Sequence, residues 1–335
     1  MRILITAPYN EKGLQEIEQQ FGEVVYRSWK PNGRAWNEEE LLGLLAESNA
    51  EALITEHDHV TARVIAANSQ LQFIGVCRGT PSNVAVSKAT EMGIPVFFTP
   101  ARNAQAVAEM FISNVIMLLR NTIPGINWLK GRQWQEGAHD SYLHFKGNEL
   151  AGKTIGMVGF GAIGQLIARM VKDYPCQIQF FDPYVTEHHP SYRKLSIEEL
   201  FATSDIVSVH LPVTAETKGL IGGSLLSKMK KDAIFVNTAR ASVVQREALL
   251  HVLEKNAIRG AILDVFDNEP PDALDYRIID MPHVIATPHI AGATHEVEDH
   301  HVEILNHALA QWYAEGNKSI AELANKEIRS IQVNG

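Results

Sequence analysis

A glycine-rich segment that follows a short apolar run constrains the fold of this chain more than any other feature. The run Thr154–Val158 has the length and composition of a buried strand, and the pattern G-x-G-x-x-G then places glycines at 159, 161 and 164. In this pattern Gly159 permits a tight turn, Gly161 lets a phosphate group approach the backbone, and Gly164 lets the next helix pack against the strand. The segment therefore predicts a strand, a turn and a helix that together bind a dinucleotide.

The residues after the glycines extend this prediction. Ala162 and Ile163 lie at the expected start of the helix, where free backbone amides and the helix dipole attract phosphate. A second apolar run, Gln177–Phe181, ends in Asp182, about 20 residues beyond the loop, the usual place for an acid that binds a ribose. Because a carboxylate accepts hydrogen bonds from the ribose hydroxyls and repels a 2′-phosphate, NAD is favoured over NADP. The alternative interpretation is a structural turn, since glycine-rich turns are common.

Length and composition indicate about two domains and exclude some classes of partner. The 335 residues exceed one ordinary core, and 45% of them are hydrophobic and 21% charged. The net charge of -9 argues against nucleic acid and anionic membranes as partners. Cys77 and Cys176 suggest neither a disulfide framework nor a zinc site, and we see no signal peptide and no apolar run that could cross a bilayer, so we expect a cytoplasmic protein.

Strand and helix patterns alternate along the chain, which is typical of doubly wound parallel sheets. Before the glycine loop we expect strands at Arg2–Thr6, Val24–Tyr26, Ala52–Thr55, Phe73–Val76 and Val96–Thr99, with helices at Leu14–Phe21, Glu38–Glu47, Ala62–Asn68 and Val84–Met92. After Asp182 we expect strands at Asp205–His210, Ala233–Asn237, Ala261–Val265 and Val284–Ala286, with helices at Ile197–Ala202, Gly223–Lys228 and Gln245–Lys255. A last helix, Glu296–Tyr313, should return to the first domain.

One helix, predicted at Asn103–Leu119, is apolar on nearly every side. This composition predicts that the helix is buried, that it bridges the two domains and that it contacts a second subunit. Trp128 and Trp134 follow in a segment that could extend the same interface, so we expect a homodimer formed through the NAD-binding domain. An ordinary core helix is the alternative interpretation.

Polar residues follow the predicted strands and should meet at one edge of the sheet, since ligands bind at the carboxyl ends of parallel strands. Arg240 offers a planar fork that can bind a carboxylate through two bonds. His289 can exchange a proton with an alcohol or ketone oxygen near neutral pH, and Glu269 can accept a hydrogen bond from its imidazole and fix the tautomer. With a nicotinamide, this set predicts hydride transfer at a carbon next to a carboxylate. Taken singly, Arg240 could equally be a surface arginine and Glu269 part of a turn.

The chain resembles the NAD-dependent D-2-hydroxyacid dehydrogenases of the phosphoglycerate dehydrogenase-like type. The resemblance runs from about Asn103 to Thr294 and rests on the stretches ARNAQAVAE, GMVGFGAIG, VSVHLPVTAETKGLIG, FVNTARASVV, AILDVFDNEPP and ATPHIAGAT. These motifs are long, ordered and mutually spaced, so they are far more specific than the glycine loop alone. The resemblance implies an enzyme that transfers hydride between NAD(H) and a D-2-hydroxy acid or 2-keto acid.

The predicted fold class is α/β, with two doubly wound parallel-sheet domains. We expect a Rossmann NAD-binding domain at residues 102–294, inserted into a flavodoxin-like substrate-binding domain made of residues 1–101 and 295–335. A 2-keto acid should enter the cleft between them, and domain closure should exclude water from the reaction.

The resemblance also assigns individual residues. It implies that Arg240 binds the substrate carboxylate, that Glu269 supports the histidine, and that His289 is the general acid in reduction. A loop of the first domain should hold the carboxylate from the other side through the backbone amides of Val76, Cys77, Arg78, Gly79 and Thr80. NAD contacts are expected from Gly159, Gly161, Ala162, Ile163, Gly164, Asp182, His210, Pro212, Thr217, Thr238, Ala239, Arg240, Asp264, His289 and Gly292.

The sequence departs from the family pattern at two places, one near the cofactor and one near the substrate. The usual glycine after the arginine is Ala241, a small change that should leave the cofactor site intact. Phosphoglycerate dehydrogenases usually carry an arginine near the end of the third strand, whereas this chain has Glu56 and Asp58 there, which disfavour a substrate phosphate. Arg78 could compensate from the neighbouring loop. The chain also stops soon after the last helix, so no regulatory domain is expected.

Two rival functions use the same fold. An NAD(H)-sensing binding protein or corepressor is disfavoured by the intact set of arginine, glutamate and histidine and by the lack of a basic patch. A formate dehydrogenase-like enzyme is disfavoured because those enzymes carry a glutamine where Glu269 stands. No metal site is expected, since His57 and His59 alternate in a loop and the histidines of the last helix, including His301, are predicted to lie on the surface.

Overall fold

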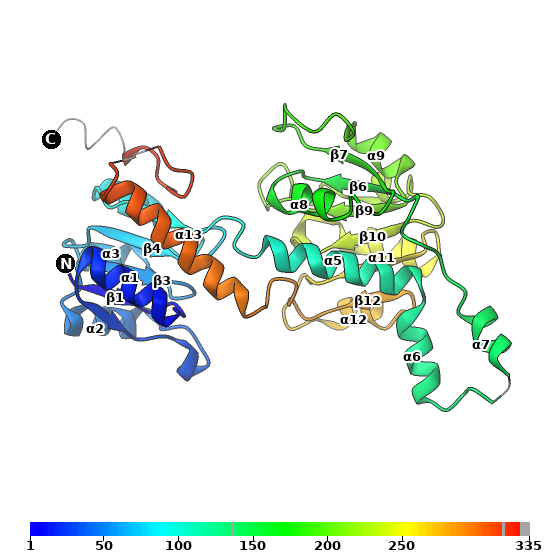
Figure 1. Cartoon of the computed structure of the whole chain (residues 1–335), viewed down its shortest axis with the longest axis horizontal. Helices are drawn as coiled ribbons and strands as arrows, with labels where there is room; N and C mark the ends of the chain where they lie inside the picture. The colour runs from blue at the N-terminus through cyan, green and yellow to red at the C-terminus, as the bar shows by residue number, and fades with distance from the viewer. Residues whose placement is uncertain (136, 317–318, 329–335) are drawn as a thin grey trace. The chain divides into compact units, whose positions relative to one another are not determined.

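The chain divides into two units, and each is built around its own parallel β-sheet. The computed structural model describes residues 1–135, 137–316 and 319–328 (Figure 1). The first unit comprises Met1–Asn103 and Thr294–Gly335, so the end of the predicted substrate-binding domain, residues 329–335, lies outside the described residues. The second unit is Ala104–Ala293.

The first unit contains a five-stranded sheet in the order β2-β1-β3-β4-β5, the order of flavodoxin-like folds. All its neighbouring strands are parallel. The strands are β1 (Ile3–Ile5), β2 (Val24–Tyr26), β3 (Ala52–Thr55), β4 (Phe73–Val76) and β5 (Val96–Phe98).

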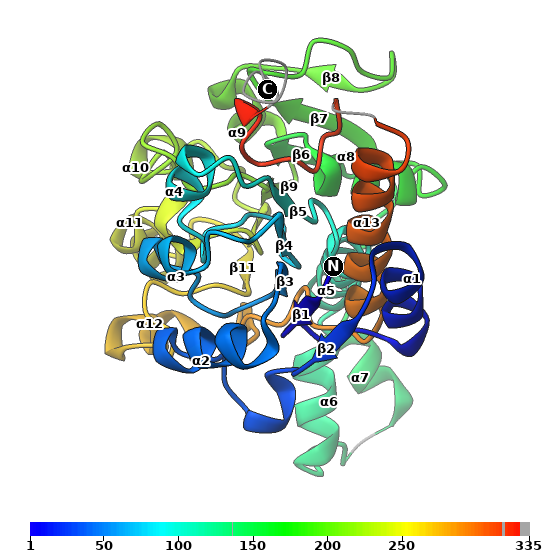
Figure 2. The same cartoon turned by 90° about the vertical axis from the view of Figure 1, so that its left-hand side faces the viewer.

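Side chains alternate across this sheet, so both faces are covered by helices. Ile3 and Ile5 pack on one face, whereas Leu4 packs on the other. Figure 2 shows α1 and α13 on one side of the strands and α2, α3 and α4 on the other. These helices are α1 (Glu11–Phe21), α2 (Glu38–Ser48), α3 (Ala62–Ala67), α4 (Val86–Glu91) and α13 (Glu296–Tyr313).

The second unit contains a seven-stranded parallel sheet in the order β12-β11-β10-β9-β6-β7-β8. The order reverses between β6 and β9, which is the point where doubly wound sheets bind their ligands. The strands are β6 (Thr154–Val158), β7 (Gln177–Phe181), β8 (Arg193–Lys194), β9 (Ile206–Val209), β10 (Ile234–Asn237), β11 (Gly260–Leu263) and β12 (Val284–Ala286). Both sheets together confirm the predicted fold class, and this second sheet has the Rossmann arrangement.

Helices cover both faces of the second sheet as well. One face packs on α5 (Ala104–Leu119) and α8 (Ala162–Met170), which Figure 1 shows in front of the strands. Phe111 and Val115 of α5 are fully buried, as its apolar sequence predicts. The other face packs on α9 (Ile197–Thr203), α10 (Gly223–Leu226), α11 (Arg246–Glu254) and α12 (Ala273–Ile279).

The sequence prediction missed several elements. The helices α6 (Thr122–Lys130), α7 (Ala138–His144) and α12 and the short strand β8 were not expected. Pro124 and Gly125 normally argue against a helix, so the sequence did not predict α6. Pro124 is tolerated because it lies in the first turn, where a backbone amide has no partner within the helix. The helix α1 begins earlier than predicted because the side chain of Asn10 caps it.

In the described part of the chain, no single helix has the length and apolar character needed to span a membrane. Only the pair α5 and α6, bent by 65° at the break between them, meets those two criteria when the helices are counted together.

Candidate active site

The three glycines of the loop after β6 have the three predicted environments. Gly159 has a φ of 92°, and a Cβ atom there would lie 2.7 Å from the carbonyl oxygen of His210. A Cβ on Gly161 would meet nothing within 4 Å, whereas one on Gly164 would lie 3.0 Å from the carbonyl oxygen of Gly159. The first and third glycines are therefore required by close packing, while the second leaves open space at the start of α8. Because no side chain caps α8, its first amides, including those of Ala162 and Ile163, suit a pyrophosphate.

Asp182 follows β7 and is joined to this loop. One carboxylate oxygen accepts a hydrogen bond from the backbone amide of Phe160 at 2.8 Å, and the other accepts one from Tyr184 at 2.9 Å. Each oxygen can accept a further bond. The half-buried carboxylate is thus held beside the glycine loop with acceptor capacity for the two hydroxyls of a ribose.

Residues that follow β9 and β10 form the next part of this edge. Nε2 of His210 lies 3.0 Å from the hydroxyl of Ser208, and its buried Nδ1 has no hydrogen-bond partner among the described residues. Burial lowers the pKa of His210 to about 4, so the ring is neutral at physiological pH. The buried hydroxyl of Thr238 likewise has no partner within the described chain. Two buried polar groups after these strands therefore lack a hydrogen-bond partner within the described chain.

Three other predicted cofactor residues lie in loops at the same ends of the strands. The hydroxyl of Thr217 donates to the carbonyl oxygen of Pro212 at 2.7 Å and closes the loop after β9. After β10, the backbone amide of Ala239 donates to the side chain of Asn237 at 3.0 Å. Both loops are therefore fixed by local hydrogen bonds.

Asp264, which follows β11, holds the loop that carries His289. Its buried carboxylate accepts hydrogen bonds from the hydroxyl of Thr287 at 2.6 Å and from the amides of Ile290 and Ala291 at 2.9 and 2.8 Å. His289 has a φ of 55°, a left-handed conformation that residues other than glycine seldom adopt. The bonds to Asp264 on both sides stabilise this conformation. Gly292 follows directly in the same loop.

Glu269 and His289 are in direct contact. Nδ1 of His289 lies 3.0 and 2.8 Å from the two carboxylate oxygens of Glu269. This contact assigns the Nδ1 proton to the hydrogen bond with the carboxylate and leaves Nε2 to face a reactant. The two side chains remain 47% and 42% exposed, so the pair is accessible.

Arg240 shares a cavity with this pair. The cavity has a volume of about 300 Å³ and is lined by Arg240, Ala241, Ser242, Val265, Phe266, Asp267, Glu269 and His289. The guanidinium of Arg240 is exposed, and its Nη1 donates to the carbonyl oxygen of Ala239 at 2.6 Å. Three residues separated widely in the sequence thus meet at one edge of the seven-stranded sheet.

The predicted substrate loop follows β4 in the first unit. Cys77 is fully buried, and burial raises the pKa of its thiol well above the usual range, which agrees with a packing residue. Nη1 of Arg78 lies 3.3 Å from Nδ1 of His57, and the backbone of Arg78 accepts a hydrogen bond from Thr99 at 2.9 Å. Val76 is buried at the end of β4, and a Cβ on Gly79 would meet nothing within 4 Å.

A buried polar network in the first unit escaped the sequence prediction. Nη1 of Arg102 donates to Glu56 at 2.7 Å and lies 2.9 Å from Nδ1 of His301, whose Nε2 donates to the carbonyl oxygen of Pro8 at 2.7 Å. Trp29 donates to the second oxygen of Glu56 at 3.1 Å. The prediction of a surface position for His301 is wrong, because this residue faces the sheet side of α13 and is fully buried.

Comparison with known proteins identifies the family. The family model described as D-isomer specific 2-hydroxyacid dehydrogenase, NAD binding domain, matches residues 112–291. The chain is 56% identical over 327 residues to YoaD of Bacillus subtilis (strain 168), named provisionally as a 2-hydroxyacid dehydrogenase, with 98% of this chain and 95% of that protein covered.

Two further relatives support the same assignment. The chain is 33% identical over 302 residues to the D-3-phosphoglycerate dehydrogenase of the same strain, covering 89% of this chain and 54% of that longer protein. The crystal structure of the TT0316 protein from Thermus thermophilus superposes with a TM-score of 0.80 at 29% identity, covering 97% of this chain and 100% of that one. The chain therefore belongs to the D-isomer specific 2-hydroxyacid dehydrogenase family and is an NAD-dependent oxidoreductase.

Proposed function

We propose that the cavity beside Arg240, Glu269 and His289 is the site where a 2-keto acid is reduced to a D-2-hydroxy acid, or the acid is oxidised in reverse. The observation that supports this most directly is the contact of His289 with both carboxylate oxygens of Glu269, which leaves Nε2 of the imidazole directed away from the carboxylate. A bound nicotinamide would supply or accept the hydride at the carbonyl carbon.

Each side chain of the cavity has one task in this proposal. Arg240 binds the substrate carboxylate through its planar fork, and its charge polarises the neighbouring carbonyl. Nε2 of His289 donates a proton to the carbonyl oxygen during reduction and accepts it during oxidation. Glu269 holds Nδ1, fixes the tautomer and stabilises the charged imidazole.

The open edge at Gly159, Gly161 and Gly164 supports a proposed pyrophosphate site there, with phosphate held by the amides of Ala162 and Ile163. Asp182 would bind the adenosine ribose and favour NAD over NADP. The remaining proposed contacts come from the strand ends and the loops after them, at His210, Pro212, Thr217, Thr238, Ala239, Arg240, Asp264, His289 and Gly292.

We assign residues 1–101 and 295–335 to a substrate-binding domain and residues 102–294 to the NAD-binding domain. The loop of Val76, Cys77, Arg78 and Gly79 would present backbone amides to the substrate carboxylate. A phosphorylated substrate is disfavoured because Glu56 stands where phosphoglycerate dehydrogenases usually carry an arginine, and the nearby guanidinium of Arg102 is already bound to Glu56.

We further propose a cytoplasmic homodimer. The buried Cys77 is a free thiol, which is consistent with the reducing conditions of the cytoplasm. The helix α6 continues from the end of α5 (Figure 1), and the segment from α6 to α7 exposes an apolar surface that a second subunit would cover, made by Leu129, Trp134, Tyr142 and Leu143. Sedimentation at several concentrations tests this, and a monomer that persists at high concentration would refute it.

The decisive experiment is NADH oxidation with a panel of 2-keto acids, repeated with NADPH. The panel should span glyoxylate, pyruvate, hydroxypyruvate, branched and sugar-derived acids, and phosphohydroxypyruvate. We expect turnover of an unphosphorylated acid with NADH. Tight NADH binding without any turnover would instead favour an NAD(H)-sensing protein on the same fold, and turnover of phosphohydroxypyruvate alone would show that Arg78 replaces the missing arginine.

A further inference from the structure

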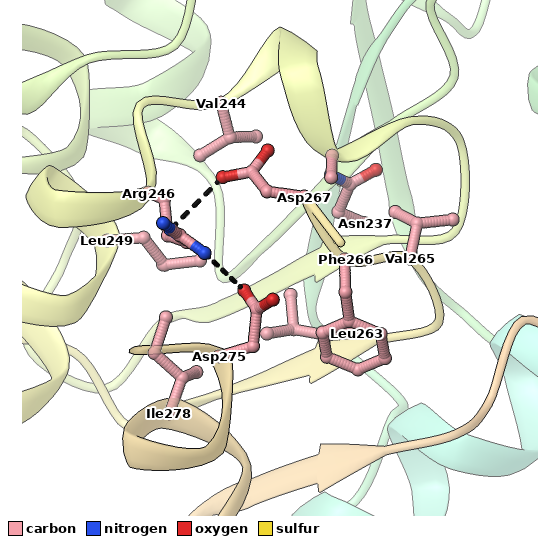
Figure 3. Close-up of a pocket in the computed structure, with 11 residues that line it drawn as sticks. Asn237, Val244, Arg246, Leu249, Leu263, Val265, Phe266, Asp267, Asp275 and Ile278 are labelled. Atoms are coloured by element: carbon pink, nitrogen blue, oxygen red, sulfur yellow. Dashed lines mark hydrogen bonds and ion pairs between the residues drawn. The ribbon is translucent and has the colours of Figure 1, made fainter. Parts of the chain in front are cut away.

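An ion cluster lies directly behind the cavity wall that carries Glu269. Arg246, the first residue of α11, donates through Nη1 to both carboxylate oxygens of Asp272, at 3.0 and 2.9 Å, and to Asp275 at 3.1 Å. Its Nε lies 3.1 Å from Oδ2 of Asp267. The two groups form an ion pair, but their geometry is not that of a hydrogen bond. Figure 3 shows the side chains of Asp267 and Asp275 directed toward Arg246, the first from above and the second from below in this view.

This cluster borders the proposed active site. Arg246, Asp267 and Asp275 line a small pocket of about 30 Å³. Phe266 and Asp267 line both this pocket and the cavity that contains His289, so the same short segment separates the two. A shift of this segment would change the wall of the cavity.

The segment from Phe266 to Asp272 is the loop that presents Glu269. Arg246 contacts it on both sides of Glu269, at Asp267 before it and at Asp272 after it. Within the loop, the side chain of Asn268 donates to Asp272 at 2.8 Å, and the amide of Phe266 donates to Glu269 at 3.3 Å. Glu269 itself is 42% exposed, so its position depends on how firmly the two flanking aspartates are anchored.

We propose that Arg246 is a positioning residue for the reaction: its guanidinium binds Asp267 and Asp272 at the same time and thereby holds Glu269 against Nδ1 of His289. The proposal rests on the proposed function of that pair. The planar guanidinium presents several donors in a fixed plane, whereas a lysine presents one point charge that cannot occupy all these positions. A displacement of about 1 Å in such a supporting residue can cost about a hundredfold in turnover.

The charges of the cluster explain why Arg246 is needed. One guanidinium faces the carboxylates of Asp267, Asp272 and Asp275, and Asp275 is buried. Burial raises the pKa of Asp267, the nearby carboxylates of Asp275, Glu247 and Asp272 add to the rise, and Arg246 opposes it. Without the cation the carboxylates repel one another, and the exposed loop is the part that can move away from the buried Asp275.

The test compares Arg246→Lys with Arg277→Lys in the full chain. Arg277 is the matched control, because it pairs with Glu254 at 2.5 Å in the same unit without contacting the loop. The measurements are kcat and KM for the 2-keto acid, NADH affinity, thermal unfolding, and the Nδ1 proton signal of His289 in the protein without substrate. His289→Ala assigns that signal.

We expect Arg246→Lys to lower kcat by about tenfold to a hundredfold with unchanged NADH affinity, and to shift or broaden the Nδ1 signal. The Arg277→Lys protein should match the wild type in all these properties.

Two results would overturn the proposal. One is wild-type kcat together with an unchanged Nδ1 signal, and the other is a loss of kcat, NADH affinity and thermal stability in parallel, which would mark Arg246 as structural. If Arg246→Lys does not fold, Asp267→Asn is the second variant. It weakens the same ion pair from the side of Asp267, which is more exposed than Arg246. If no 2-keto acid is turned over, the Nδ1 signal still decides whether Arg246 positions Glu269.

Discussion

At the carboxyl edge of the seven-stranded sheet, Arg240, Glu269 and His289 face an open cavity, whereas at the same edge of the five-stranded sheet the charged residues bind one another. Glu56 and Arg102 form a salt bridge in which the side chains are 6% and 16% exposed, and His301 is fully buried against them. Glu269 and His289 form an ion pair of similar length, yet each is more than 40% exposed.

The comparison teaches that a close charge pair can serve two purposes. A buried pair that loses one partner leaves an uncompensated charge away from water, so its integrity determines stability. An exposed pair contributes little to stability, because water screens it, and is free to act on a reactant. The two pairs should therefore respond in opposite ways to substitution.

The largest effect is expected from His289→Ala. We predict that turnover falls by about 100- to 10,000-fold, since general acid catalysis is lost, while NADH affinity and thermal stability stay near the wild-type values. Steady-state kinetics, NADH fluorescence titration and thermal unfolding measure the three quantities. His307→Ala, an exposed histidine of α13, is the control. Equal losses of turnover and NADH affinity would count against the role of His289 as the acid.

The second prediction concerns stability and the buried pair of Glu56 and Arg102, tested by Arg102→Met. Removal of the guanidinium leaves the carboxylate of Glu56 buried without its main partner, and we expect the free energy of unfolding to fall by about 3 kcal/mol. Urea unfolding measures this change. The double variant with Glu56→Gln should recover much of the loss, because the uncompensated charge is then absent. If the single variant were as stable as the wild type, the contrast between the two edges would disappear.

Arg240→Lys tests whether the exposed arginine of the cavity binds the substrate. The exposed guanidinium contributes little to stability, whereas a point charge cannot replace its two-bond contact with a carboxylate. We expect KM for the 2-keto acid to rise about tenfold, equivalent to about 1.4 kcal/mol, without a change in thermal unfolding. An unchanged KM would remove Arg240 from the substrate site.

The last prediction concerns the pH dependence of stability and His210, a half-buried residue whose Nδ1 is shielded from water. Because burial lowers its folded-state pKa to about 4, below the ordinary value of about 6.5, the unfolded chain binds the proton first as pH falls. The free energy of unfolding should therefore fall progressively from about pH 6.5 to about pH 4, by up to about 3 kcal/mol if the whole pKa difference is realised.

Urea unfolding of the wild type and His210→Asn across this range provides the measurement. The difference in unfolding free energy between the two proteins should change with pH in that window and stay constant above it. A constant difference throughout would show that His210 is not protonated differently in the two states.

Local patterns allowed much of the second unit to be predicted from the sequence. The glycines at 159, 161 and 164 have the predicted packing, because a turn of this kind is determined by residues close together in the chain. The strands β6, β7 and β12 have the predicted bounds, since short apolar runs between polar turns identify buried strands. Arg240, Glu269 and His289 share a cavity because parallel strands end at one edge, a rule of the fold that requires no detailed coordinates.

The sequence by itself thus determined the parallel-sheet fold, the glycine loop and the residues gathered at its edge. Only the tertiary structure decided which charges are buried and which partners they have. Arg246 meets Asp275 across 29 residues and Arg102 meets His301 across 199, and no local pattern specifies such pairs. His301 shares a polar stretch of α13 with exposed residues, and its burial depends on which face of that helix packs on the sheet. Burial depends on packing between segments distant in the sequence, whereas turns and strands depend mainly on neighbours.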